Sequence, residues 1–89
     1  MATITVNKQG EGEFEVTVAA GSTTTHVVTL TDAYYEKLTG GAVAADELVS
    51  KSFEFLLERE SNTMILSRFE LPVISQYFPE FEKTIKSRI

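Results

Sequence analysis

Cysteine is absent from this chain, and histidine occurs once, at position 26. The absence of cysteine excludes disulfides, thiolate nucleophiles and zinc sites that depend on sulfur ligands. A single imidazole also excludes the zinc motif that sets two histidines on one helical turn. No apolar run approaches the ~20 residues that cross a bilayer, and no cationic segment followed by an apolar run opens the chain. We therefore expect a cytoplasmic protein that does not bind membranes.

Basic side chains are scarce in the first half of the chain. Residues 1–47 carry seven acidic and two basic side chains, whereas residues 48–89 carry six of each. An acidic half repels phosphate backbones, so we expect no nucleic-acid partner. The one basic stretch contains Lys83, Lys86 and Arg88. These cations suit the last turns of a helix, where they offset the negative end of its dipole.

Apolar and polar side chains alternate through most of residues 3–30, which is the pattern of half-buried strands. Ile4 and Val6 share one face of the first run, and Phe14, Val16 and Val18 share one face of the second. The segment "NKQGEG" separates these runs and contains the glycines that a hairpin turn needs. The segment "AAGS" separates the second run from a third. The pattern predicts an antiparallel meander of three strands.

The third run, residues 24–30, places His26, Val28 and Leu30 on one face and Val27 on the other. We expect the His26 face to point inward because it contains Leu30, with His26 at the rim of the core. Val27 then lies on an outer face lined by threonine.

After residue 31 the apolar pattern takes the period of a helix. Thr31 or Asp32 is expected to cap a short helix that ends at Gly40, a residue that adopts the left-handed conformation without strain. Residues 45–61 form the strongest predicted helix. Its apolar arc is wide, so we expect it to be covered on more than one side.

The segment "RFELPVISQYFPEFEK", residues 68–83, concentrates aromatic side chains near the C-terminus. A short helix is expected to start at Ser61 or Asn62 and to run through Leu66, and Pro72 and Pro79 then delimit two short helices or one kinked helix. We expect this tail to close the core over the helix at 45–61 rather than to serve as a surface for a partner. The side chains predicted to do so are Ile74, Phe78, Phe81 and Ile85.

These patterns predict one α+β domain over residues 1–89. A three-stranded antiparallel β-meander in residues 1–30 is followed by three to four helices in residues 31–89, packed on one face of the sheet.

The segments "LTGGAVAADELVSKSFEFLLERES" and "ILSRFELPVISQYFPEFEK" resemble a family of small, uncharacterised bacterial proteins. The resemblance covers roughly the C-terminal two-thirds of the chain. In that family, proline or acidic residues are expected at the helix start where this chain has Ala44 and Ala45. The resemblance supports the helical part of the fold and implies no activity and no functional residue.

Candidate catalytic and metal-binding groups are few and scattered. Ser22, His26 and Asp32 are the residue types of a hydrolase triad, but no Gly-x-Ser-x-Gly elbow presents the serine. Glu13 and Glu15 share one strand face, which is typical of a solvated face and would need a cleft to serve as a sugar or cation site. We expect no catalytic residue, no metal ligand and no cofactor.

The sequence does not identify a biochemical function. The expectation is a small non-catalytic binding or regulatory module that acts through protein–protein contacts, as a monomer or weak homodimer. The alternatives are a self-associating structural protein and a small enzyme that relies on His26 and the carboxylates. The candidate interaction surface comprises Val27, Tyr34, Tyr35 and Tyr77.

Overall fold

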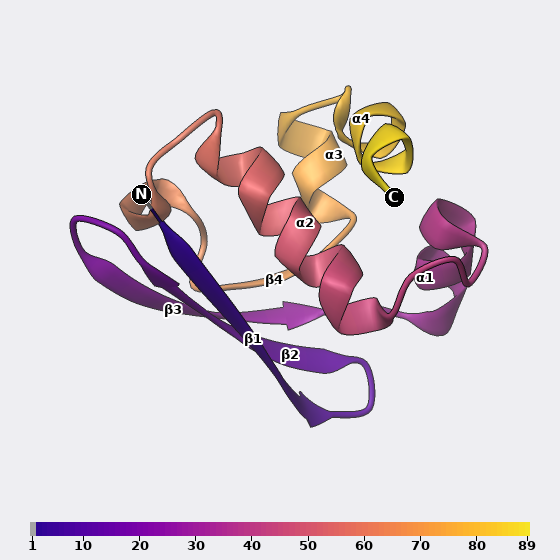
Figure 1. The fold of residues 1–89 in the computed structure, drawn as a ribbon, viewed down its shortest axis with the longest axis horizontal. Coiled ribbons are helices and arrows are strands. Elements are labelled where there is room, and N and C mark those ends of the chain that lie inside the picture. The colour runs from indigo at the N-terminus through magenta and orange to yellow at the C-terminus, as the bar shows by residue number, and fades with distance from the viewer. Residues whose placement is uncertain (1) are drawn as a thin grey trace.

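The computed structural model of the protein describes residues 2–89 (Figure 1). Its strands are β1 (Thr3–Gly10), β2 (Glu13–Ala19), β3 (Thr23–Thr29) and β4 (Arg68–Glu70). Its helices are α1 (Asp32–Thr39), α2 (Ala45–Leu57), the 3₁₀ turn η1 (Asn62–Met64), α3 (Val73–Tyr77) and α4 (Phe81–Arg88). Figure 1 shows the helices on one side of a twisted sheet, with α2 across the strands and α3 and α4 beyond it. The α+β class is therefore confirmed.

The first three strands form the predicted meander. Strand β1 pairs antiparallel with β2, and β2 pairs antiparallel with β3. The turn between β1 and β2 requires a glycine at position 12, where φ is +71° and an added Cβ would lie 2.8 Å from the carbonyl oxygen of Leu30. The Leu30 N–H donates to the Gly12 carbonyl at 2.7 Å, so the turn is tied to the end of β3.

The prediction of a three-stranded, fully antiparallel sheet is wrong, because β4 joins β3 in parallel. The sheet is mixed, with strand order β1-β2-β3-β4. A parallel pair needs a crossover connection, and here α1, α2 and η1 supply it. Strand β4 has only three residues, which is too short for an alternating pattern to stand out in the sequence.

The helix ends follow the sequence signals for α1 and depart from them after α2. The side chain of Thr31 accepts a hydrogen bond from the Tyr34 N–H, and Gly40 ends α1 with φ +59°, as predicted. The helix expected to run through Leu66 is instead the three-residue turn η1, followed by extended chain. None of the helices within residues 2–89 has the length and apolarity that a membrane span requires.

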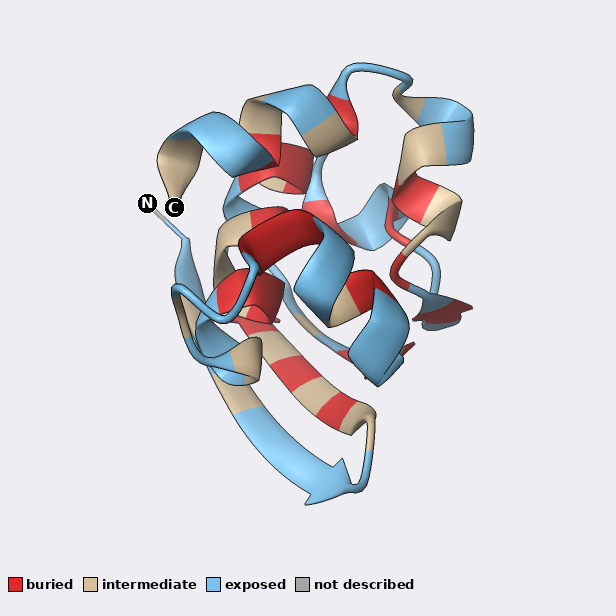
Figure 2. Cartoon of the chain, turned by 90° about the vertical axis from the view of Figure 1, so that its right-hand side faces the viewer, coloured by how far each residue is buried: buried red, intermediate tan, exposed pale blue. Residues whose placement is uncertain are grey.

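One hydrophobic cluster lies between the sheet and the helices. Figure 2 shows buried positions alternating with less buried ones along β2, and buried positions gathered on the inner side of the helices. The largest fully buried side chains are Phe53, Phe55, Phe81, Leu48 and Leu71. Helix α2 therefore has the wide buried arc that its sequence predicts.

The C-terminal tail closes this core, as predicted. Ile74, Phe81 and Ile85 are buried, and Phe78 is half-buried. The rings of Phe78 and Phe81 meet the ring of Phe55 on α2 edge-on, with centroids 5.9 and 5.2 Å apart. Such edge-to-face pairs are a preferred aromatic geometry. The segment between α3 and α4 contains Pro79, so the tail is two helices rather than one.

Candidate functional site

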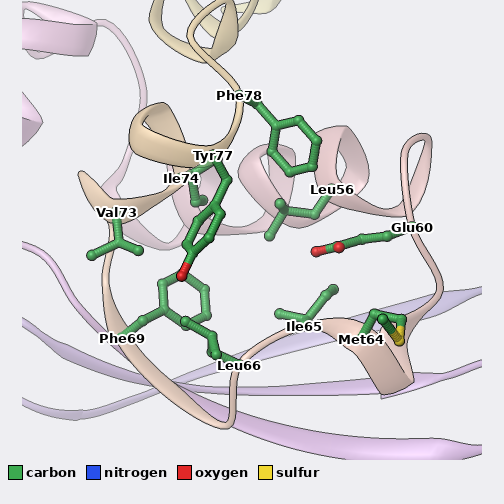
Figure 3. Close-up of a pocket in the computed structure, with 10 residues that line it drawn as sticks. All are labelled: Leu56, Glu60, Met64, Ile65, Leu66, Phe69, Val73, Ile74, Tyr77 and Phe78. Carbon is green, nitrogen blue, oxygen red and sulfur yellow. The ribbon is translucent and has the colours of Figure 1, made fainter.

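Three large apolar side chains stand out from the core because they are exposed: Met64 at 70%, Leu66 at 47% and Tyr77 at 67%. All three line one open cavity of about 180 Å³ (Figure 3). We call this cavity the β4 groove. Its lining residues come from the end of α2, from the 64–69 segment and from α3: Leu56, Glu60, Met64, Ile65, Leu66, Phe69, Val73, Ile74, Tyr77 and Phe78.

The short elements around the groove divide its side chains between a floor and a rim. Leu56, Phe69 and Ile74 are buried and form the floor. Tyr77 is three residues beyond Ile74 on a helix of only five residues, and it lies at the exposed edge. Figure 3 shows Tyr77 reaching from α3 over the groove, opposite the segment that carries Leu66. The rim therefore offers apolar contact area to solvent.

The groove holds very few polar groups. Glu60 is its one charged lining residue, and it belongs to no ion pair within residues 2–89. The Tyr77 hydroxyl is the other polar side-chain group. The described residues contain no cluster of three potential metal ligands. One carboxylate and one phenol in an apolar lining can contact and orient a bound group, but they make neither a nucleophile–base pair nor a metal site.

His26 lies behind the groove and is 2% exposed. The prediction that its strand face points inward is confirmed, but the prediction that His26 lies at the rim of the core is wrong. Its Nδ1 lies 2.8 Å from the carbonyl oxygen of Leu66. Because a carbonyl can only accept, Nδ1 carries the proton, and Nε2 accepts from the Thr24 hydroxyl at 2.8 Å. The ring also meets Phe53, with centroids 5.4 Å apart. His26 thus holds the backbone of a rim residue in place.

Asn62 makes a second link between the groove and the sheet. It is 4% exposed, and its side-chain nitrogen donates to the Ser22 carbonyl and to the Thr24 hydroxyl oxygen, both at 2.9 Å. The sequence predicted a helix start here, and η1 does begin at Asn62. The Asn62 side chain also ties η1 to the turn between β2 and β3, so the segment that carries Met64 and Leu66 is fixed at both ends.

The structure does not bring the four candidate interaction residues together. Tyr34 is buried and donates to Glu82 at 2.9 Å. Tyr35 is half-buried and donates to the carbonyl of Val43. Val27 is half-buried on the outer face of the sheet. Of the four, Tyr77 alone lines the groove.

Sequence reasoning missed Met64 and Leu66 as surface residues. The available signal was the apolar run "MIL" at residues 64–66, which begins on the last residue of η1 and in which only the middle residue is buried. These residues were expected to continue a short helix, whereas Met64 ends η1, the chain is extended from Ile65, and Met64 and Leu66 are exposed.

The other candidate chemical groups are also apart. His26 contacts Thr24 and Leu66 rather than Ser22 or Asp32. Glu13 lies 3.6 Å from Arg68 on the outer face of the sheet, outside the groove.

A polar cluster joins α1 to α4 and gives the protein a predicted pH dependence. The Tyr34 hydroxyl donates to Glu82, and Lys37 lies 3.3 Å from the same carboxylate. Hydrogen bonds from Tyr34 and Lys37 hold the pKa of Glu82 below its usual range, while burial and this contact raise the pKa of Tyr34. The pKa of Glu82 is lower in the folded state than in the unfolded state, where it is about 4.3, so the ionised carboxylate stabilises the fold at pH values above about 4.3. This stabilisation is lost as the pH falls through the folded-state pKa.

We therefore expect Glu82→Gln to be less stable than the wild type at pH 7 and to lose less stability on acidification. Urea unfolding of both proteins between about pH 3 and pH 7 measures this difference. Glu58 and Glu80 also have lowered pKa values, so both proteins weaken in acid, and only the difference between them reports on Glu82. Parallel stability curves would contradict the expectation.

No family model, no curated protein and no solved structure matches this chain. The resemblance to small bacterial proteins therefore stays a prediction.

Proposed function

We propose that this protein is a small non-catalytic protein-binding module and that the β4 groove is its binding site. One observation carries the proposal. The exposed large apolar side chains of the described chain, Met64, Leu66 and Tyr77, all gather around one cavity. Exposed apolar side chains scattered singly are normal on a protein surface, whereas a contiguous apolar patch around a hollow is typical of a binding surface.

The size of the cavity supports a protein partner. An apolar cavity of ~150 Å³ accommodates a benzene molecule, and sites for drug-sized ligands and cofactors usually measure ~300–1,000 Å³. The groove, at about 180 Å³, therefore accepts one aliphatic or aromatic side chain and is small for a cofactor. A side chain from another protein fits this volume, and its backbone can lie on the open rim.

The groove is testable with a fragment of a protein chain. We expect N-acetyl-leucine amide, titrated into ¹⁵N-labelled protein, to shift the amide signals of Leu66, Phe69 and Tyr77 with millimolar affinity. Leu66→Ser should weaken this binding about tenfold, as loss of a well-placed contact does. The fold should be unaffected because Leu66 is 47% exposed.

Val27→Ser is the matched control, because Val27 lies on the opposite face of the sheet from the groove. It should leave the affinity for N-acetyl-leucine amide unchanged. Shifts spread evenly over the protein, or equal binding by the Leu66→Ser variant, would contradict the proposal.

A further inference from the structure

The outer edge of β4 carries backbone groups that no strand of the described chain pairs. The Val27 N–H donates to the Ser67 carbonyl at 2.8 Å, and the Leu71 N–H donates to the Thr29 carbonyl at 2.9 Å. In a parallel ladder these two bonds direct the N–H and C=O of Phe69 toward β3. The N–H and C=O of Arg68 and Glu70 then point away from the sheet. Strand β4 is the last strand of the sheet, so this edge is open for pairing.

We propose that the partner of this edge is a second copy of the same chain, paired antiparallel through β4 about a two-fold axis at Phe69. The inference rests on the proposed function, because it names a partner for the surface formed by the groove and β4. In this register Arg68 of each copy lies opposite Glu70 of the other. The backbone N–H and C=O of Arg68 in one copy then bond to the backbone C=O and N–H of Glu70 in the other. This is the hydrogen-bonded pair of an antiparallel ladder.

Charge complementarity selects this register. The side chains of Arg68 and Glu70 are both exposed on the outer face of the sheet. Opposite charges on directly paired residues stabilise a ladder, and like charges destabilise it. A shift by two residues in one direction sets Arg68 opposite Arg68, and a shift in the other direction sets Glu70 opposite Glu70. The three-residue strand Arg-Phe-Glu is thus self-complementary in one alignment only.

The apolar rim of the groove lies next to this pairing. With Phe69 on the axis, residues 64–66 of one copy run toward residues 72–74 of the other. Met64 and Leu66, which are 70% and 47% exposed, then approach the start of α3 in the second copy. A three-residue edge offers few hydrogen bonds, and short edges normally protect sheets from pairing. Burial of these apolar side chains supplies the additional driving force.

The test uses charge exchange measured by sedimentation equilibrium. The wild type should shift from monomer toward dimer as its concentration rises from about 10 µM to about 1 mM, as expected of a small interface. Arg68→Glu and Glu70→Arg should each weaken self-association at least tenfold, because each sets two pairs of like charges across the axis. An equimolar mixture of the two variants should associate as the wild type does, and the double variant R68E/E70R should regain self-association.

Arg68 also lies 3.6 Å from Glu13, so Glu70→Arg provides the cleaner single variant. Thermal melts of each variant test whether it is folded. Self-association of either single variant at wild-type strength, or a mixture that stays monomeric, would overturn the inference. A wild type that stays monomeric at ~1 mM would also overturn it, because the dissociation constant would then exceed about 1 mM, which is too weak for a specific dimer. In that case, binding of N-acetyl-leucine amide at Leu66 would still support the groove as a site for another protein, so the two proposals fail separately.

Discussion

Phe81→Ala should remove about 3–5 kcal/mol from the free energy of unfolding, the typical cost of truncating a buried phenylalanine. Phe81 is fully buried, and its ring meets Phe55 of α2 at 5.2 Å. A domain of this kind has only ~5–15 kcal/mol in total. Since one kcal/mol corresponds to about 4–8 °C in a small domain, the melting temperature should fall by roughly 12 °C or more. Thermal unfolding followed by circular dichroism measures the change.

Tyr77→Ala is the matched control for Phe81→Ala. Tyr77 belongs to the same aromatic tail, but it is 67% exposed. Substitutions at exposed positions usually change stability by less than about 0.5 kcal/mol, so the melting temperature should hardly move. A Phe81→Ala protein that melts with the wild type would show that the tail does not close the core.

His26→Ala should destabilise the protein by about 2–4 kcal/mol, from lost ring packing and a lost hydrogen-bond network. The substitution leaves the Leu66 carbonyl without its donor and removes the contact with Phe53. Because His26 holds the chain that leads into β4, the effect should concentrate there. The substitution should speed deuterium exchange at the amide of Val27, which donates to Ser67, by a larger factor than at the amides that pair β1 with β2.

Thr25→Ala controls for a change in β3 itself, because Thr25 is the exposed neighbour of His26 on the opposite face. It should leave both stability and the exchange of Val27 close to wild type. Equal destabilisation by the two substitutions would contradict a specific role for the His26 links.

The alternation of apolar residues and the capping residues were sufficient to predict β1 to β3 and α1. Strand alternation located β1 to β3 and placed Val16, Val18 and Val28 in the core, where they are fully buried. Thr31 and Gly40 marked the ends of α1 because capping chemistry acts within one helical turn.

The C-terminal tail was predicted in part from its composition. The sequence indicated that its aromatic residues close the core, and Phe81 is fully buried. It also separated Phe81 from Tyr77, because Phe81 was predicted to close the core and Tyr77, which is 67% exposed, was a candidate interaction residue. The sequence did not show that Tyr77 lies beside Met64 and Leu66, since that depends on how α3 packs relative to residues 64–66.

The sequence by itself determined the α+β class, the meander, the apolar arc of α2 and the absence of thiol chemistry. Only the tertiary structure decided that Arg68–Glu70 becomes a strand, that His26 is buried, and that Met64, Leu66 and Tyr77 surround one groove. The physical reason is distance along the chain. Strand β4 exists because Val27 and Arg68 meet across a helical crossover, and His26 is satisfied by a carbonyl 40 residues away. Contacts between residues so far apart in the chain produce no periodic pattern of apolar residues in the local sequence.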